Sequence, residues 1–140
     1  MKVLANDGIS KSGIDLIEKN GFEVKGTKVA QEQLPKYINK NNITVLLVRS
    51  ATQVRKDIID ECKGLKIIGR GGVGMDNIDV EYAKEKGLFV AVWGIQNAEE
   101  VVMLKKIGVS AVTSDWPDQI QEYLNNDQKE DITEDPKAKE

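Results

Sequence analysis

The sequence predicts an α/β protein built on a six-stranded parallel sheet. Six apolar, β-branched runs recur along the 140 residues, first after 21 residues and then every 22, centred on Val3, Val24, Leu46, Ile68, Val90 and Val112. A helical pattern lies between successive runs, and strands that alternate with helices at this spacing form parallel sheets with right-handed crossovers. We therefore expect a flavodoxin-like three-layer sandwich with strand order 2-1-3-4-5-6.

Capping residues, prolines and glycines set the expected bounds of six helices. A capping side chain precedes four of them, and asparagine or glycine follows most of them. The expected caps or first residues are Ser10, Leu34, Gln53, Asp79, Asn97 and Asp115. The expected ends are Asn20, Asn39, Cys62, Gly87, Gly108 and Leu124. Pro35 and Pro117 then lie in first turns, where the missing N–H of proline is not needed.

The composition changes after Leu124. Residues 125–140 contain six acids against three lysines and too few apolar residues to fold on their own. We expect a single flavodoxin-like domain over residues 1–124, followed by a disordered acidic tail over residues 125–140. Acidic runs commonly stay solvated, although such a tail can also bind a partner.

Overall composition limits the partners and the location of the chain. The formal net charge of -3 gives no basic surface for nucleic acid. No apolar run approaches the roughly 20 residues that span a bilayer, and the first residues do not form a signal peptide. We therefore expect a cytoplasmic chain without nucleic-acid or membrane partners. The single cysteine, Cys62, excludes an internal disulfide and a cysteine-rich metal site.

The chain contains no histidine. It therefore lacks the side chain best suited to proton transfer near neutral pH, which is also the commonest metal ligand. Any catalysis would need a carboxylate or a lysine with a shifted pKa. We expect no catalytic residue, no metal site and no bound cofactor in this chain.

The candidate site is an anion site at the carboxyl ends of the strands, where open parallel sheets bind ligands. Arg49 and Arg70 follow neighbouring strands at equivalent positions. Two arginines, two hydroxyls and the N–H groups of a glycine loop suit a small carboxylate or phosphate. The candidate residues are Arg49, Ser50, Thr52, Arg70, Gly71, Gly72 and Gly74. The alternative is that Arg49 pairs with Asp7 across the sheet edge.

The loop from Gly69 to Gly74 also satisfies the dinucleotide pattern G-x-G-x-x-G. Two features argue against NAD binding by this loop. Residues 75–79 separate it from the next helix, and the following strand ends in Ala91-Val92-Trp93 rather than in a ribose-binding acid. A glycine-rich turn at a strand end is the plainer interpretation.

Residues 1–90 resemble the substrate-binding lobe of the D-2-hydroxyacid dehydrogenases, specifically those of the D-3-phosphoglycerate dehydrogenase type. The motifs are Leu46–Thr52 (LLVRSAT) and Leu65–Val80 (LKIIGRGGVGMDNIDV). The resemblance implies a flavodoxin-like lobe in which Arg49-Ser50 and residues 70–74 face the cleft that holds the phosphorylated acid. It ends near residue 90, before the family's NAD domain and its catalytic histidine, glutamate and second arginine.

Residues 92–124 (VWGIQNAEEVVMLKKIGVSAVTSDWPDQIQEYL) resemble, over a shorter and less specific stretch, the last βα units of glycerophosphodiester phosphodiesterase barrels. The His-Arg-Gly motif and the metal-binding carboxylates of those enzymes are missing. The resemblance implies that Trp93 and Trp116 flank a substrate mouth, although they can equally cover the sheet edge. The chain would then be a chimera, natural or engineered, joined near residues 88–93.

Two hypotheses for function follow. The first is a non-catalytic chimeric or truncated domain that retains weak binding of a small phosphate or carboxylate anion. The second is an oxidoreductase fragment, an NAD-dependent D-3-phosphoglycerate dehydrogenase of serine biosynthesis, that needs a nucleotide domain in trans. The sequence leaves open whether the chain forms a homodimer.

Overall fold

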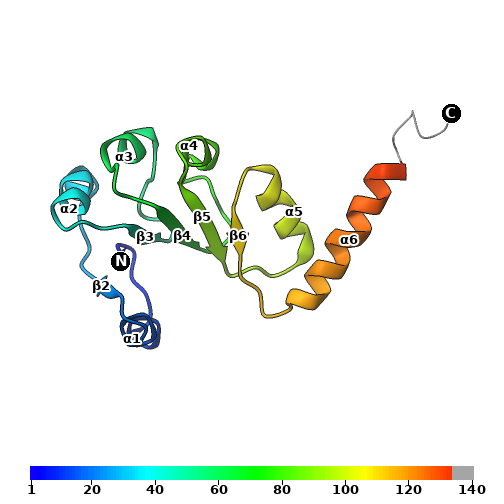
Figure 1. Cartoon of the computed structure of the whole chain (residues 1–140), viewed down its shortest axis with the longest axis horizontal. Helices are drawn as coiled ribbons and strands as arrows, with labels where there is room; N and C mark the ends of the chain where they lie inside the picture. Colours follow the sequence, from blue (N-terminus) through cyan, green and yellow to red (C-terminus); the bar gives the residue numbers. More distant parts are fainter. Residues whose placement is uncertain (134–140) are drawn as a thin grey trace.

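The computed structural model describes residues 1–133 and contains one six-stranded, all-parallel sheet (Figure 1). The strand order is β2-β1-β3-β4-β5-β6, so the predicted fold class and order are confirmed. Each predicted strand centre lies in a strand. The strands are β1 (Lys2–Ala5), β2 (Glu23–Lys25), β3 (Val45–Val48), β4 (Ile67–Gly71), β5 (Phe89–Trp93) and β6 (Ala111–Val112).

Six α-helices and one short 3₁₀ helix, Gln31–Gln33, connect and follow the strands. The helices are α1 (Lys11–Lys19), α2 (Leu34–Lys40), α3 (Lys56–Glu61), α4 (Val80–Glu85), α5 (Ala98–Lys106) and α6 (Pro117–Thr133). Two predicted caps are confirmed, because Ser10 Oγ accepts the N–H of Gly13 and Asn97 Oδ1 accepts the N–H of Glu100. α3 begins later than predicted, since the residues before it belong to the loop that builds the candidate site.

The last helix does not end at Leu124 as predicted, because α6 continues to Thr133. Residues 125–133, which the composition assigned to a disordered tail, therefore belong to this helix. Their scarcity of apolar side chains excludes a core but not a helix, since glutamine, glutamate and lysine are good helix formers. The rest of the predicted tail, residues 134–140, lies outside the described residues.

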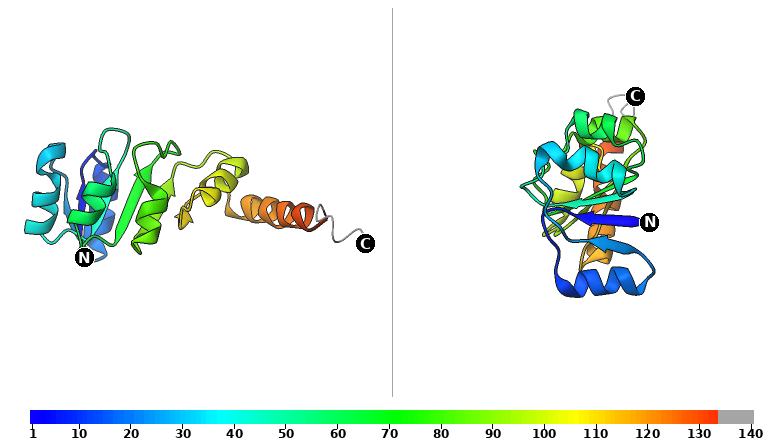
Figure 2. Two further views of the ribbon diagram at one scale, coloured as in Figure 1. Left: turned by 90° about the horizontal axis from the view of Figure 1, so that it is seen from above. Right: turned by 90° about the vertical axis from the view of Figure 1, so that its left-hand side faces the viewer.

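The main hydrophobic core lies on one face of the sheet. Figure 1 shows α2, α3 and α4 on this side, and α1 on the opposite side beside β2. Leu4, Leu46, Ile68 and Val90 come from four adjacent strands, are fully buried and belong to this core together with Leu104 of α5. α6 packs against α5 and runs outward past β6 (Figure 2). No helix within residues 1–133 combines the length and apolar character that crossing a bilayer requires.

Candidate anion site at the strand carboxyl ends

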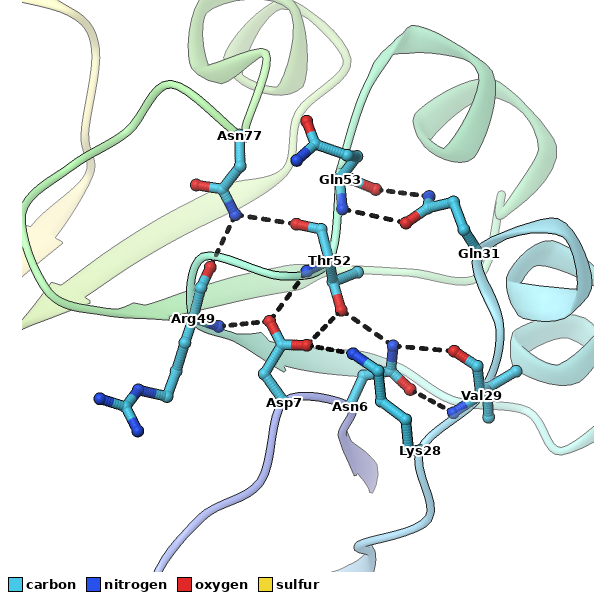
Figure 3. Close-up of polar contacts among 9 residues, drawn as sticks. All are labelled: Asn6, Asp7, Lys28, Val29, Gln31, Arg49, Thr52, Gln53 and Asn77. Atoms are coloured by element: carbon cyan, nitrogen blue, oxygen red, sulfur yellow. Dashed lines mark hydrogen bonds and ion pairs between the residues drawn. The ribbon is translucent and has the colours of Figure 1, made fainter.

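Asp7 holds the turn that follows β3. It comes directly after β1, and its carboxylate accepts the N–H groups of Arg49 at 2.8 Å and Thr52 at 3.0 Å and the hydroxyl of Thr52 at 2.6 Å (Figure 3). Lys28, which follows β2, adds an ion pair at 2.6 Å. The side chain of Asp7 is only 4% exposed, whereas that of Lys28 is 59% exposed. A single carboxylate therefore fixes the backbone of the turn over residues 49–52.

Competing effects set the pKa of the Asp7 carboxyl. Burial alone would raise this pKa, because it disfavours the charged form. The hydrogen bonds from Lys28, from the Thr52 hydroxyl and from the backbone of Arg49 and Thr52 outweigh burial, and together they lower the pKa from its usual value of 3.8 to about 2. The network therefore holds Asp7 as an anion down to strongly acidic pH.

Asn6 completes this network on its buried side. Its amide donates to Thr52 Oγ1 at 2.9 Å, donates to the carbonyl of Val29 and accepts the N–H of Val29 at 2.8 Å. Thr52 is 1% exposed, and its only hydroxyl proton goes to Asp7. Within this structure Thr52 therefore positions the turn, and its hydroxyl proton is committed inside the protein.

Arg49 contacts Asp7 through its backbone, not through its side chain. The alternative of an Arg49–Asp7 ion pair is therefore wrong, since Lys28 is the cation that pairs with this carboxylate. Figure 3 shows the guanidinium of Arg49 pointing away from the cluster. Arg49 and Ser50 are both exposed, and the ion pairs found among the described residues do not include Arg49. Both residues are accessible to a ligand from solvent.

Arg70 lies at the end of β4 and is only 6% exposed. Its Nε donates to Asn77 Oδ1 at 3.0 Å, and its Nη1 donates to the carbonyl of Gly71 at 2.9 Å. Both acceptors are neutral, and Arg70 forms no ion pair with any side chain that the structure describes. The guanidinium is thus a buried cation whose direct hydrogen-bond partners carry no charge, an arrangement that proteins rarely leave uncompensated.

Asn77 joins Arg70 to the turn after β3. While its Oδ1 accepts from Arg70, its Nδ2 donates to the carbonyls of Arg49 at 2.7 Å and Thr52 at 2.8 Å. Neither Asn77 nor Asn6 is among the site residues predicted from the sequence. A signal was present, because an amide side chain can donate and accept at once, and Asn6 directly follows β1 while Asn77 lies in the loop between β4 and α4.

The first glycines of the predicted loop make room for an indole. A Cβ added at Gly69 would lie 2.7 Å from Leu47 Cδ2 and 3.1 Å from Trp93 Cζ3, and one added at Gly71 would lie 2.9 Å from the Trp93 ring. Gly72 has φ +101°, and its N–H donates to the carbonyl of Trp93 at 2.8 Å. The expectation that the Gly72 N–H is free for an anion is therefore wrong, and the glycine pattern is explained without a nucleotide.

Gly74 lies on the other side of the loop, beside Arg70. A Cβ at Gly74 would be 3.5 Å from Arg70 Nη2 and 3.6 Å from Asp76 Oδ1. The N–H groups of Ser50, Val73 and Gly74 take part in none of the hydrogen bonds found between loops over the described residues. These three N–H groups, the Arg70 guanidinium and the exposed side chains of Arg49 and Ser50 are the donors that remain available to an anion.

A short bridge fastens the loops that follow β3 and β4 to each other. The N–H of Val54 donates to the carbonyl of Asn77 at 2.8 Å, and the N–H of Asp79 donates to the carbonyl of Val54 at 3.0 Å. The Asp79 carboxylate accepts the N–H of Lys56 at 3.0 Å and pairs with Arg55 at 3.2 Å. The Asp79 side chain therefore accepts a hydrogen bond from the first turn of α3, whereas the sequence predicted that this side chain would cap α4.

Comparison with known proteins identifies the family. The model for the catalytic domain of D-isomer specific 2-hydroxyacid dehydrogenases matches residues 3–103. The chain belongs to this family. Curated members similar to it include D-3-phosphoglycerate dehydrogenase of Archaeoglobus fulgidus, 44% identical over 91 residues, and hydroxypyruvate reductase of Thermotoga maritima, 46% identical over 90 residues. Each match covers 64% of this chain, but only 17% and 29% of the respective enzyme.

Two solved structures share the fold of this chain. The TT0316 protein of Thermus thermophilus superposes with a TM-score of 0.58 at 27% identity, covering 64% of this chain and 29% of that protein. The PH0520 protein of Pyrococcus horikoshii reaches 0.60 at 22% identity, covering 73% of this chain and 31% of that protein, which supports the fold alone. The dehydrogenase resemblance of the first segment is confirmed.

The comparisons differ on where the resemblance ends, because the curated relatives match over about 90 residues, as predicted, whereas the family model extends further. The family match continues to residue 103 and so includes β5 and the first part of α5, beyond the end expected near residue 90. These comparisons give no support to the likeness of residues 92–124 to glycerophosphodiester phosphodiesterases. The motifs that hold the site, over residues 46–52 and 65–80, both lie inside the match to the 2-hydroxyacid dehydrogenase family.

Proposed function

We propose that this chain is the substrate-binding part of an NAD-dependent 2-hydroxyacid dehydrogenase of the D-3-phosphoglycerate dehydrogenase type, and that it binds a small phosphorylated or carboxylate anion beside Arg70. The buried guanidinium of Arg70 carries this proposal, because its acceptors in the described residues are neutral. A bound anion would supply the compensating charge. The N–H groups of Ser50, Val73 and Gly74 would add donors to the same anion.

The same chain does not supply the catalytic groups. Hydride transfer to or from a hydroxy acid needs a bound nicotinamide and a group that moves the hydroxyl proton, and the 140 residues include no histidine for the second task. In this proposal these residues orient the substrate, and a nucleotide-binding domain outside the 140 residues provides the cofactor and the proton-transfer group.

A non-catalytic anion-binding domain is the second candidate. The end of the family match at residue 103 favours this candidate, because the end of α5 and all of α6 then lie outside the match to the dehydrogenase family. A chimera whose residues 92–124 derive from a phosphodiesterase barrel is one form of this candidate. Both candidates share the anion site and differ in whether a nucleotide domain restores hydride transfer.

The anion site is tested by titrating the chain with inorganic phosphate and with 3-phosphoglycerate while following amide resonances. We expect the N–H signals of Ser50, Val73 and Gly74 to shift first, with a dissociation constant of about 1 mM, because solvent screens an open site. Arg70→Ala should weaken binding about tenfold or more, since a charge-assisted hydrogen bond contributes roughly 1.5–3 kcal/mol.

Arg55→Ala is the matched control, because Arg55 lies in the neighbouring loop but pairs with Asp79. It should leave the titration midpoint unchanged. Arg70→Lys retains the charge and should bind more tightly than Arg70→Ala if both variants fold. Equal midpoints for the wild type and Arg70→Ala would overturn the anion site.

Mixing experiments separate the two candidates. The chain is added to the nucleotide-binding half of the Archaeoglobus fulgidus enzyme, produced without its first lobe, and NADH formation from 3-phosphoglycerate is measured. NADH formation above that of either component alone supports the dehydrogenase part. Anion binding without any NADH formation in the mixture favours the non-catalytic domain.

A further inference from the structure

The carboxyl ends of β5 and β6 border a cavity that is separate from the anion site. Its volume of about 330 Å³ is at the lower end of the range of about 300–1,000 Å³ that small-molecule sites occupy. Its lining comes from the end of β5 with the loop that leads to α5, and from the loop between β6 and α6 (Figure 1). Open parallel sheets bind ligands beyond the carboxyl ends of their strands, so this cavity lies where a second ligand is expected.

Two indoles line this cavity, and the glycines of β4 hold the first of them in place. A Cβ at Gly71 would lie 2.9 Å from each of Nε1, Cε2 and Cζ2 of Trp93, and one at Gly69 would lie 3.1 Å from Cζ3 at the other end of the ring. The indole therefore lies across both glycines. Its other side borders the cavity, because Trp93 is one of the lining residues and is only half-buried.

Trp116 supplies the second indole from the start of α6. Its backbone is fixed, because its N–H donates to Ser114 Oγ at 2.9 Å and its carbonyl accepts the N–H of Ile120 at 3.2 Å. The residue is nevertheless 49% exposed, which is unusual for so large an apolar group. Two indoles on fixed backbone are contact surfaces that lose little conformational entropy when a ligand binds.

The charge at this cavity is negative. Asp115 lines it, and none of the lining residues that the structure describes is basic. The Asp115 carboxylate takes part in none of the ion pairs found over the described residues. The N-termini of α5 and α6 carry partial positive charge beside the cavity. Acids in their first turns offset this charge, namely Glu99 and Glu100 in α5 and Asp118 in α6.

We propose that this cavity binds a methylated ammonium group, with its methyl groups against the indoles of Trp93 and Trp116 and its charge beside Asp115. The face of an indole attracts a cation, and tryptophan is the best of the aromatic side chains at this. An uncharged apolar group in the cavity would cover the Asp115 carboxylate without an opposite charge, and an anion would be repelled by it. A cation that carries apolar surface satisfies the carboxylate and the rings together.

The cavity and the proposed anion site select ligands of opposite charge. Arg70 and the free N–H groups of Ser50, Val73 and Gly74 do not line the cavity. The two proposals therefore rest on different residues and can fail independently.

Tryptophan fluorescence of the whole chain tests this proposal directly, because the two tryptophans of the sequence both line the cavity. The probe is tetramethylammonium chloride, with sodium chloride at equal ionic strength as the reference. We expect a saturable change in emission with a dissociation constant of about 1–10 mM, since the site is open to solvent. Ammonium lacks the methyl groups and tert-butanol lacks the charge, so each should bind at least about threefold more weakly.

Substitutions at the cavity separate the contribution of the charge from that of the rings. Asp115→Asn keeps both indoles and should weaken binding about threefold, because the pair that it removes is exposed to solvent. Trp116→Leu should weaken binding about fivefold, with Trp93 as the remaining reporter. Asp118→Asn and Tyr123→Leu are the matched controls, since both residues are exposed on α6 and neither lines the cavity. Both controls should leave the titration midpoint unchanged.

Urea unfolding checks that each variant is folded, and Asp115→Asn remains a test if Trp116→Leu does not fold. An emission change no larger than that with sodium chloride would overturn the proposal. Binding of tert-butanol as tight as that of tetramethylammonium, or equal losses in Asp115→Asn and Asp118→Asn, would also overturn it.

A peptide with one trimethylated lysine identifies the source of the group. Binding of this peptide that is tighter than that of tetramethylammonium, and that is lost with unmodified lysine, supports a modified side chain as the ligand. Binding weaker than that of tetramethylammonium supports a free small molecule.

Discussion

The two ends of the same sheet edge are built in different ways. At the end formed by β1, β3 and β4, three polar side chains hydrogen-bond the turn over residues 49–52 and the buried Arg70. They are those of Asn6, Asp7 and Asn77. Beyond β5 and β6, Trp93 and Trp116 line an open cavity of about 330 Å³ in which hydrogen bonds such as that from the Trp116 N–H to Ser114 Oγ hold no charged lining side chain in place. Both regions occupy the position where parallel sheets bind ligands. Only the first arranges its donors in advance around a charge, and this difference is why we place the anion site there.

The strongest test of this difference is removal of the carboxylate of Asp7. Asp7→Ala leaves two N–H groups and a hydroxyl without their acceptor, so we expect a loss of about 3 kcal/mol in the free energy of unfolding. Asp115→Ala at the tryptophan end is the control and should change it by about 0.5 kcal/mol or less, because Asp115 is exposed. Urea denaturation measures both. Equal losses would mean that the two ends do not differ.

The pH dependence of stability tests the same carboxylate with a smaller expected effect. The pKa of Asp7 in the folded chain is lowered to about 2 from a usual 3.8, so its contribution is present above about pH 4 and is lost as the pH falls toward 2. The shift corresponds to about 2 kcal/mol. The wild type should therefore lose about 2 kcal/mol more than Asp7→Asn between pH 5 and pH 2. If the free energies of unfolding of the wild type and Asp7→Asn fell in parallel over this pH range, the hydrogen bonds to Asp7 would not be the cause of the loss.

The smallest effect concerns how the glycine loop seats Trp93. Gly71→Ala places a Cβ 2.9 Å from the indole, and we expect a loss of about 1–2 kcal/mol as the ring moves. Gly64→Ala is the control, because a Cβ there meets no atom within 4 Å. It should be neutral or slightly stabilising. Thermal unfolding measures both variants, and a neutral Gly71→Ala would show that the ring yields without cost.

The fold could be predicted because strand period, caps and turn glycines all indicate the same βα repeat. The extent of α6 could not, since polar residues such as Gln128 and Lys129 are compatible with both a helix and a solvated tail. For the candidate site, the sequence could predict that its residues lie at the strand ends but not which hydrogen bonds they form. Strand-end chemistry identified Arg70 and Thr52, whereas the sequence could not tell which hydroxyl protons and N–H groups would be used inside the protein, as at Thr52 and Gly72.

The side chain of Asn77 has a mechanical consequence. It bonds the Arg70 side chain on one side and the carbonyls of Arg49 and Thr52 on the other, while its own carbonyl accepts from Val54. The loops after β3 and β4 can therefore separate only if several of these bonds break together. They form one cooperative unit that is either assembled or open, so a ligand that touches either loop stabilises both.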